Sequence, residues 1–214
     1  MKVTLISSTQ VPGLVCGEAA AVCTKSKNPL SALYHSVESG HTSVLEHASF
    51  TFRIENISRV TLAQLTRHRI ASFSVESQRY VRADDPDIVV PESIKDSKYS
   101  DEAAELIERS VELYNKLTGI EVPCEDARYI LPMGSPTTLI MTMNARELLH
   151  FFSLRCCNRA QWEIRELADA MLSICLEQWP DIFKNAGPGC VTGKCPEKRP
   201  CGHPRNNERI IEKI

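Results

Sequence analysis

The sequence lacks long apolar runs and an excess of one charge, and each absence excludes a class of protein. Its 214 residues contain no window of 18 uninterrupted apolar residues, so we expect no transmembrane helix. The first 22 residues carry one lysine and an apolar stretch broken by Ser, Thr, Gln and Pro, which does not fit a secretion signal. With 25 basic and 27 acidic side chains, the net charge is −2, so local arginine clusters must supply any phosphate-binding site.

The sequence also lacks internal repeats, and no Pro- and Gly-rich linker divides its first 180 residues. A charged share of 24% and a hydrophobic share of 43% are ordinary for a globular protein, which excludes a disordered chain. We therefore expect an α+β fold over residues 1–183, a single domain with a mixed or antiparallel sheet packed by several helices and a helix-rich second half. Residues 184–214 are predicted to form a Cys-rich tail.

Nine cysteines are present, and their positions divide them into two groups. Six lie in apolar or helical segments and are predicted to be small buried hydrophobes in a reducing cytoplasm. These are Cys16, Cys23, Cys124, Cys156, Cys157 and Cys175. The tail spaces Cys190, Cys195, Cys201 and His203 as C-x4-C-x5-C-x-H, which is the one candidate metal site in a chain otherwise predicted to hold no metal. The alternative is a mobile extension without a metal.

Hydrophobic periodicity and capping residues predict the order of the secondary structure. Strands are expected at 2–7, 48–57 and 137–144, with a further short strand in the loop that begins at residue 71. Helices are expected at 14–24, 29–39, 59–69, 101–118, 123–131, 145–157 and 159–178. Gly40 is predicted to end the second helix, Ser58 and Asn144 to be N-caps, and Pro180 to end the last helix. Core candidates of 101–118 are Ala104, Ile107, Val111 and Leu113.

Two arginine clusters are the candidate phosphate-binding groups. The first is Arg67-His68-Arg69, followed within a dozen residues by Ser72, Ser74, Ser77, Gln78 and Arg79. Guanidinium groups, hydroxyls and loop N–H groups together are typical of a phosphate site. On the predicted helix 59–69, Gln64 lies three residues before Arg67 and four before His68, so all three share one face. The alternative is a solvated patch paired with Asp84, Asp85 and Asp87.

The second cluster lies in the predicted helix after Asn144. Arg146 and His150 are four residues apart, as are Arg155 and Arg159, so each pair is predicted to share a helix face. The alternative is a core helix with snorkelling arginines. Two such clusters in one chain favour a ligand with several phosphates.

A third group, His41, Ser43, Glu46 and His47, surrounds the entry to the strand at 48–57. We reject a metal site here, because the order of the residues is not H-E-x-x-H. Arg128 stands apart from both arginine clusters, and a surface ion pair with Glu125 or Asp126 is the alternative to a binding role.

Arg67 to Ser77 reads Arg-His-Arg, seven residues, then Ser, and it resembles the signature of the flavin-dependent thymidylate synthases. Further blocks resemble the same family in the family's order over about residues 40 to 172. They are GHTSVLEHASFTF, QLTRHRIASF, SQRYV, EDARYILP, TMNARELLHFFSLR and AQWEIRELA. The resemblance implies reductive methylation of dUMP to dTMP, with methylenetetrahydrofolate as carbon donor, FAD as redox cofactor and NADPH as reductant, giving tetrahydrofolate. It also implies a homotetramer whose active sites are shared between subunits.

The resemblance implies roles for individual residues. Arg155 matches the arginine that activates the uracil ring. The implied dUMP-binding positions are Gln64, Leu65, Thr66, Arg67, Val75, Glu76, Ser77, Gln78, Arg79, Arg128 and Arg155. The implied FAD-binding positions are Ser43, Arg67, His68, Arg69, Val75, Asn144, Arg146 and His150. Two of them depart from some relatives: Val75 replaces a polar or acidic residue, and His150 replaces Asn.

Three rival interpretations remain. A classical thymidylate synthase uses a cysteine nucleophile, and Cys156 and Cys157 follow Arg155 directly, although the resemblance favours a structural role for both. The second rival is an RNA- or nucleotide-binding module, against which the near-neutral charge and the lack of interleaved aromatic residues argue. The third is a family member that has lost activity and serves structurally in an assembly. We expect no nucleic-acid and no membrane partner.

Overall fold

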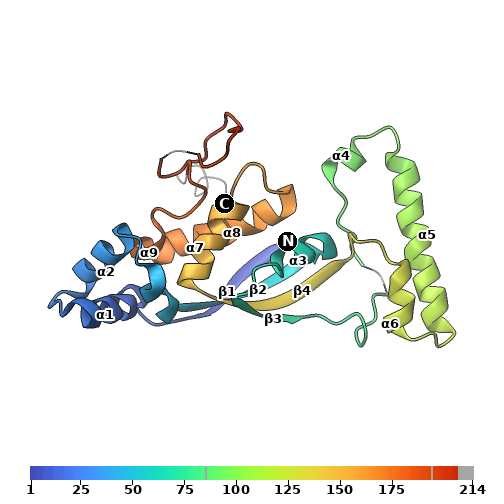
Figure 1. Ribbon diagram of the computed structural model, residues 1–214. Coiled ribbons are helices and arrows are strands. Elements are labelled where there is room, and N and C mark those ends of the chain that lie inside the picture. The colour runs from blue at the N-terminus through green and yellow to red at the C-terminus, as the bar shows by residue number, and fades with distance from the viewer. Residues whose placement is uncertain (85, 194, 207–214) are drawn as a thin grey trace. The chain divides into compact units, whose positions relative to one another are not determined.

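The computed structural model describes residues 1–84, 86–193 and 195–206. The strands are β1 (Lys2–Ser8), β2 (Ser49–Ser58), β3 (Ala71–Val75) and β4 (Pro136–Asn144). The α-helices are α1 (Pro12–Thr24), α2 (Pro29–Glu38), α3 (Arg59–Leu65), α4 (Glu92–Lys95), α5 (Ser100–Gly119), α6 (Cys124–Ala127), α7 (Ala145–Arg155), α8 (Trp162–Gln178) and α9 (Pro180–Phe183). Two 3-10 helices, η1 (Thr42–His47) and η2 (Arg128–Ile130), complete the order (Figure 1).

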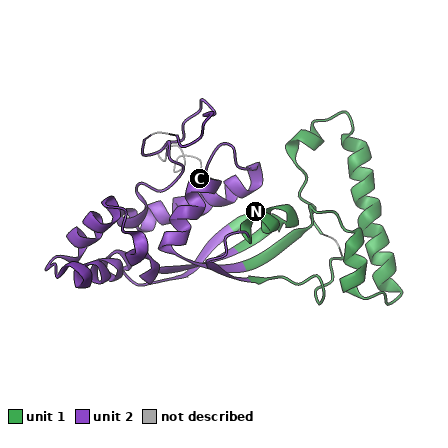
Figure 2. Ribbon diagram, viewed as in Figure 1, with its two compact units in different colours: residues 1–2, 54–66, 74–139 green, residues 3–53, 67–73, 140–214 purple. Residues whose placement is uncertain are grey.

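The strands form one four-stranded sheet in the order β1-β2-β4-β3, which confirms the predicted α+β class. By its contacts the chain divides into two compact units (Figure 2). Unit 1 holds residues 1–2, 54–66 and 74–139, and unit 2 holds residues 3–53, 67–73 and 140–214. Four of the five boundaries between the units fall within strands, and the fifth, between residues 66 and 67, follows α3. The predicted domain boundary at residue 183 separates a tail and stays a prediction.

The core of unit 2 is built on alternation along β2. Phe50 and Phe52 point inward and are fully buried, as the period of a strand requires. The Phe50 ring meets Trp179 edge to face, with centroids 4.7 Å apart, and Phe183 at 5.5 Å. Phe152 of α7 packs against Phe183 at 6.0 Å. This aromatic cluster anchors α7, the helix that carries most of the second arginine cluster.

The predicted caps are confirmed. The Ser58 side chain accepts a hydrogen bond from the Thr61 N–H at 3.1 Å and starts α3. The Asn144 side chain accepts from the Glu147 N–H at 2.8 Å and starts α7. Each of these bonds satisfies an N–H group that a helix terminus would leave without a partner. Gly40 ends α2 with a φ of 81°, a conformation that side-chain-bearing residues rarely adopt.

Several predicted boundaries are wrong. The helix predicted to reach Arg69 ends at Leu65, where Thr66 turns the side-chain hydroxyl onto the carbonyl of Leu62. The helix predicted at 123–131 is two short pieces, α6 and η2. Arg159 lies beyond the end of α7, so it shares no helix face with Arg155. Pro180 both follows α8 and begins α9, because its fixed φ suits a first helical turn.

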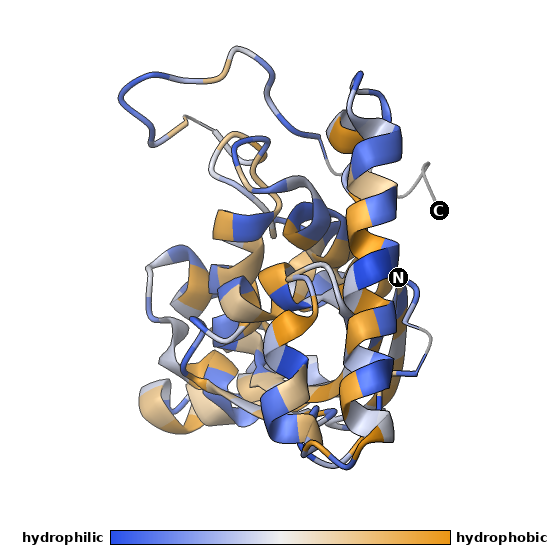
Figure 3. Cartoon of the chain, turned by 90° about the vertical axis from the view of Figure 1, so that its right-hand side faces the viewer, coloured by the Kyte–Doolittle hydropathy of each residue, from blue (hydrophilic) through white to orange (hydrophobic). Residues whose placement is uncertain are grey.

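The prediction of buried core residues is least accurate for helix α5. Of its residues, all of them described, only Tyr114 is buried, whereas Ala104 and Leu113 are exposed and Ile107 and Val111 are half-buried. Leu106 is 69% exposed. Figure 3, in which α5 stands nearest the viewer, shows apolar residues alternating with polar ones along its length. The amphipathic pattern is correctly recognised, but within one chain its apolar face stays largely open to solvent.

The cysteines of the first group behave as predicted only in part. Cys16, Cys156 and Cys175 are buried, whereas Cys124 and Cys157 are half-buried and Cys23 is exposed. Cys23 sits in the last turn of α1 and is not among the buried residues of that helix. Among the described residues, no helix is both long and apolar enough to cross a membrane.

Candidate functional site

A chain of three polar side chains links α7 to the segment after α3 in unit 2. His68 lies in an irregular stretch, and its Nδ1 is 3.0 Å from Oε1 of Glu147. Nε of Arg155 donates to Nε2 of His68 at 3.1 Å. His68 is 4% exposed and Glu147 is 7% exposed, so their contact is shielded from water. The sequence separates these residues by 79 and 87 positions, and the fold brings them together.

Aromatic rings enclose the His68 imidazole from α7. The Phe151 ring meets it edge to face at 5.0 Å, and the His150 ring lies at 5.9 Å. Burial lowers the pKa of His68, Glu147 opposes this shift, and the positive charge of Arg155 adds to it. Burial also lowers the pKa of Arg155, and the nearby Arg67 guanidinium lowers it further. Arginine stays protonated despite such a shift, so the site keeps a partly desolvated cation.

Next to these three hydrogen-bonded side chains, unit 2 contains a hollow of about 530 Å³. Its lining includes cationic, amide, carboxylate and apolar side chains. They are Thr42, Glu46, Ile70, Asn144, Arg146, Glu147, Leu149 and His150. This volume lies in the range of small-molecule and cofactor sites. At its edge Nη1 of Arg146 donates to Oε1 of Glu46 at 2.5 Å.

Three of the predicted FAD-binding residues line this hollow: Asn144, Arg146 and His150. Ser43, Arg67, His68 and Arg69 belong to the same unit, whereas Val75 belongs to unit 1. Glu147 was not predicted from the sequence. At the third position of α7 it resembles an ordinary helix-start carboxylate, and only its burial against His68 distinguishes it.

Most predicted dUMP-binding residues lie in unit 1, namely Gln64, Leu65, Thr66, Val75, Glu76, Ser77, Gln78, Arg79 and Arg128. Arg67 and Arg155 lie in unit 2. The prediction that Gln64 shares a helix face with Arg67 and His68 is wrong, because α3 ends before Arg67. Leu65 is fully buried, so its side chain belongs to the core of the protein.

The loop at 76–81 is a tight turn held by Ser77. The Ser77 carbonyl accepts from the N–H groups of Tyr80 and Val81, and its hydroxyl accepts from the Arg79 N–H at 3.2 Å. Arg79 pairs with Glu125 at 2.7 Å, and Arg128 donates from Nε to the Glu125 carbonyl at 3.0 Å. The SQRYV and EDARYILP blocks are therefore neighbours in space, through Glu125.

Arg59 is a second residue that the sequence did not reveal. Its Nη2 donates to the Glu76 carbonyl at 3.0 Å and so supports the start of the turn. Burial lowers the pKa of Arg59, Glu76 opposes this shift, and Arg128 adds to it. Arg59 and Arg128 are thus close enough to repel, which a ligand with negative charge would relieve. Of the acids proposed as partners of the first cluster, Asp84 pairs with Arg82, and Asp85 lies outside the described residues.

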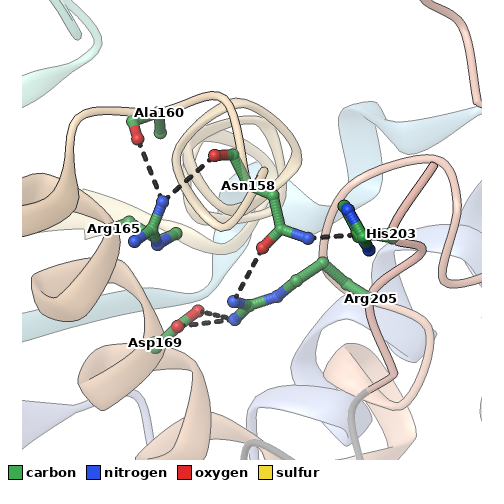
Figure 4. A network of polar contacts seen from close by, with 6 residues as sticks. All are labelled: Asn158, Ala160, Arg165, Asp169, His203 and Arg205. Atoms are coloured by element: carbon green, nitrogen blue, oxygen red, sulfur yellow. Dashed lines mark hydrogen bonds and ion pairs between the residues drawn. The ribbon is translucent and has the colours of Figure 1, made fainter. Parts of the chain in front are cut away.

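Within unit 2, the tail packs against the segment between α7 and α8 and against the middle of α8 (Figure 4). Arg205 donates from Nη2 to both carboxylate oxygens of Asp169 at 2.5 Å and from Nη1 to the Asn158 side chain at 3.3 Å. Asn158 in turn donates to the His203 carbonyl at 2.7 Å. An ion pair in which both carboxylate oxygens are bound fixes the orientation of the arginine as well as its position. The described part of the tail is therefore held against α8 and the segment that precedes it.

Cys190, Cys195, Cys201 and His203 line a common hollow of about 420 Å³, which Arg155 also borders. In the part of the chain that the structure describes, no three His, Cys, Asp or Glu side chains are arranged to hold a metal ion. The same holds for the group at 41–47, where both histidines are exposed. The metal site proposed for the tail therefore stays a prediction.

Cys156 is poorly suited to be a nucleophile. It is fully buried, and burial together with the nearby Asp169 raises the pKa of its thiol far above the ordinary value. A thiolate is the reactive form of cysteine, and this environment disfavours it. The double substitution Cys156→Ala, Cys157→Ala is therefore expected to leave the dTMP formation that the resemblance implies within about threefold of wild type. Loss of all turnover with dUMP binding intact would show that a cysteine attacks the substrate.

Comparison with known proteins identifies the family. The family model for thymidylate synthase complementing protein (Thy1) matches residues 4–181. A flavin-dependent thymidylate synthase of Geobacter sulfurreducens is 45% identical over 230 aligned positions, which cover 100% of this chain and 99% of the relative. One from Clostridium tetani is 38% identical and covers 98% and 96%. One from Pyrococcus furiosus is 44% identical over 188 positions, covering 82% and 77%.

Proposed function

The chain belongs to the flavin-dependent thymidylate synthases, and from this premise we propose which of its residues carry out the reaction. The reaction is the reductive methylation of dUMP to dTMP, with methylenetetrahydrofolate as carbon donor, FAD as redox cofactor and NADPH as reductant. The released folate is tetrahydrofolate. The observation that carries the residue assignment is the half-buried Arg155 guanidinium, which is held by His68, and the contact of His68 with Glu147, which lines a hollow of cofactor size.

Arg155 is proposed to activate the uracil ring of dUMP. A guanidinium next to the ring nitrogen N3 and its carbonyl favours the ionised ring and directs electron density toward C5, where the new carbon bond forms. The partial burial of Arg155 strengthens this effect, because charges interact more strongly where water is excluded. Its place at the end of α7, anchored by the aromatic core, holds the guanidinium on a rigid element.

The hollow in unit 2 fits a dinucleotide such as FAD. Arg146 offers a cation for a phosphate, Asn144 and His150 offer polar contacts, and Ile70 and Leu149 offer apolar surface for a planar ring. We assign Ser43, Arg67, His68, Arg69, Val75, Asn144, Arg146 and His150 to FAD binding. Bound there, FAD supplies the redox chemistry, while the chain orients the reactants and sets the electrostatic environment.

The dUMP phosphate is proposed to bind at the turn in unit 1. Ser77 and Arg79 lie in this turn, and Arg128 is held beside it through Glu125. Hydroxyl, loop N–H and guanidinium donors in one place are typical of a phosphate site. The further assigned positions are Gln64, Thr66, Arg67, Val75, Glu76 and Gln78, and Leu65 can contribute only through its backbone.

We further propose a homotetramer with active sites shared between subunits. The open apolar face of α5, with Leu106 and Leu113 exposed, supports burial against another copy. The proposed location is the cytoplasm, because a reducing compartment keeps the buried Cys16, Cys156 and Cys175 as thiols.

An FAD titration tests the cofactor assignment. The wild-type protein is expected to bind FAD, turn yellow, and lose the colour on addition of NADPH. Arg146→Ala is expected to weaken FAD binding about tenfold or more, because a charged hydrogen bond to phosphate contributes about 1.5–3 kcal/mol. Lys27→Ala, at an exposed cation of unit 2 that does not line the hollow, is the matched control and is expected to bind FAD as wild type does. Equal FAD affinity in the Arg146 and Lys27 variants would refute the assignment.

A further inference from the structure

We propose that Glu147 is a positioning residue whose carboxylate holds His68 in the one tautomer that can accept a hydrogen bond from Arg155. The inference rests on the role proposed above for Arg155, and it adds a residue to which the family resemblance assigned no role. Glu147, His68 and Arg155 form a continuous relay, with contacts of 3.0 Å and 3.1 Å between successive side chains. The relay lies wholly within unit 2.

The direction of each hydrogen bond follows from which atoms carry protons. Nε of arginine is always a donor, so the Nε2 of His68 that receives it must carry a lone pair. A neutral imidazole with a bare Nε2 has its proton on Nδ1. That Nδ1–H then donates to Oε1 of Glu147, and an ionised carboxylate is the acceptor that favours this tautomer most.

The charges around His68 support a neutral ring. Glu147 faces it from the first turn of α7, and Arg155 and His150 face it from further along the same helix. Burial and the Arg155 charge favour the uncharged imidazole, although Glu147 alone would favour the imidazolium. A protonated His68 would point an N–H at the N–H of Arg155 and break the relay.

The relay fixes how the guanidinium plane is turned. A lone arginine side chain rotates about several bonds, and the bond from Nε to an immobile imidazole removes much of that freedom. His68 is held in place because the Phe151 ring packs against it edge to face. It is also held by its contact with Glu147, which belongs to α7 and is only 7% exposed. The carboxylate charge also compensates the Arg155 charge across the neutral ring.

Glu147→Gln tests the relay, since the amide is nearly isosteric but can present an N–H to Nδ1 and favour the wrong tautomer. We expect kcat for dTMP formation to fall about 10- to 100-fold, by analogy with the loss seen when a carboxylate that orients a metal-binding imidazole is removed. The KM for dUMP is expected to change by less than about threefold. Glu147→Asp retains the carboxylate and is expected to recover part of kcat.

The matched control is Glu163→Gln, since Glu163 is also buried, at 3% exposure, but lies in the first turn of α8. It is expected to leave kcat unchanged. Thermal unfolding of each variant shows whether a loss of activity reflects a loss of fold. If Glu147→Gln does not fold, the kcat of Glu147→Asp tests the proposal instead.

NMR of protein labelled on the histidine ring nitrogens gives a readout that needs neither FAD nor turnover. In the wild-type protein near neutral pH, His68 is expected to carry its proton on Nδ1 and a lone pair on Nε2. In Glu147→Gln the two tautomers are expected to mix. A wild-type His68 protonated on Nε2, or on both nitrogens, overturns the relay, as does a Glu147→Gln enzyme with full kcat. A wild-type protein with the expected tautomer but no dTMP formation instead refutes the proposed function.

Discussion

Replacing Arg155 by lysine is expected to lower kcat for dTMP formation by about 100- to 1,000-fold, the usual cost of removing one preorganised electrostatic contact. Lysine keeps a positive charge but has a single ammonium group, so it cannot bind His68 and the uracil ring in the planar geometry of a guanidinium. The variant is expected to keep its fold, because Arg155 is only half-buried and occupies the last position of α7. Rapid-quench measurement of dTMP gives kcat directly.

The control for Arg155→Lys is Arg159→Lys, four residues further along the chain. Arg159 is exposed and donates to the Arg199 carbonyl in the tail, so it shares the neighbourhood of Arg155 without the contact to His68. It is expected to retain nearly full activity. If both variants lose activity equally, the effect belongs to the region as a whole and Arg155 has no special role in activating uracil.

Replacing Phe152 by alanine is expected to destabilise the protein by about 3–5 kcal/mol, because a large buried ring leaves a cavity. Phe152 is fully buried, joins α7 to Phe183 through a ring contact at 6.0 Å, and packs against its α7 neighbour Phe151 at 5.7 Å. A change of this size lowers the melting temperature by about 10 °C in a chain of this length. Differential scanning calorimetry of the cofactor-free protein measures it.

Leu154→Ala is the matched control for Phe152→Ala, since it lies on the same helix and is 48% exposed. It is expected to shift the melting temperature by less than about 3 °C. Comparable losses at the two positions would mean that the aromatic cluster does not anchor α7.

The sequence predicted most of the elements because their signals are local. Strand alternation identified β2, and the side chains of Ser58 and Asn144 marked the starts of α3 and α7. The end of α3 was missed because Thr66 has no strong breaking tendency and the turn there depends on tertiary structure. The core of α5 was missed because hydrophobic periodicity shows an apolar face but does not show what covers it.

The residues of the candidate site also divide into those that the sequence revealed and those that it did not. Arg155, Arg146 and Asn144 were found because the residues around them form recognisable blocks. Glu147 was not, because its significance depends on a contact to His68, 79 positions away in the chain. Arg59 was not found either, since its partner is the backbone carbonyl of Glu76, which leaves no trace in side-chain spacing. Contacts between residues far apart in the chain, and contacts to backbone atoms, could therefore not be predicted from the sequence.

The most direct test of the account is a product analysis of one reaction. Purified protein is incubated without oxygen with dUMP, methylenetetrahydrofolate, FAD and NADPH, and the nucleotide and folate products are separated and quantified. The account predicts equal amounts of dTMP and tetrahydrofolate, both dependent on FAD and both lost in Arg155→Lys. Formation of dihydrofolate without any need for FAD would contradict it, as would undiminished dTMP formation by the Arg155 variant.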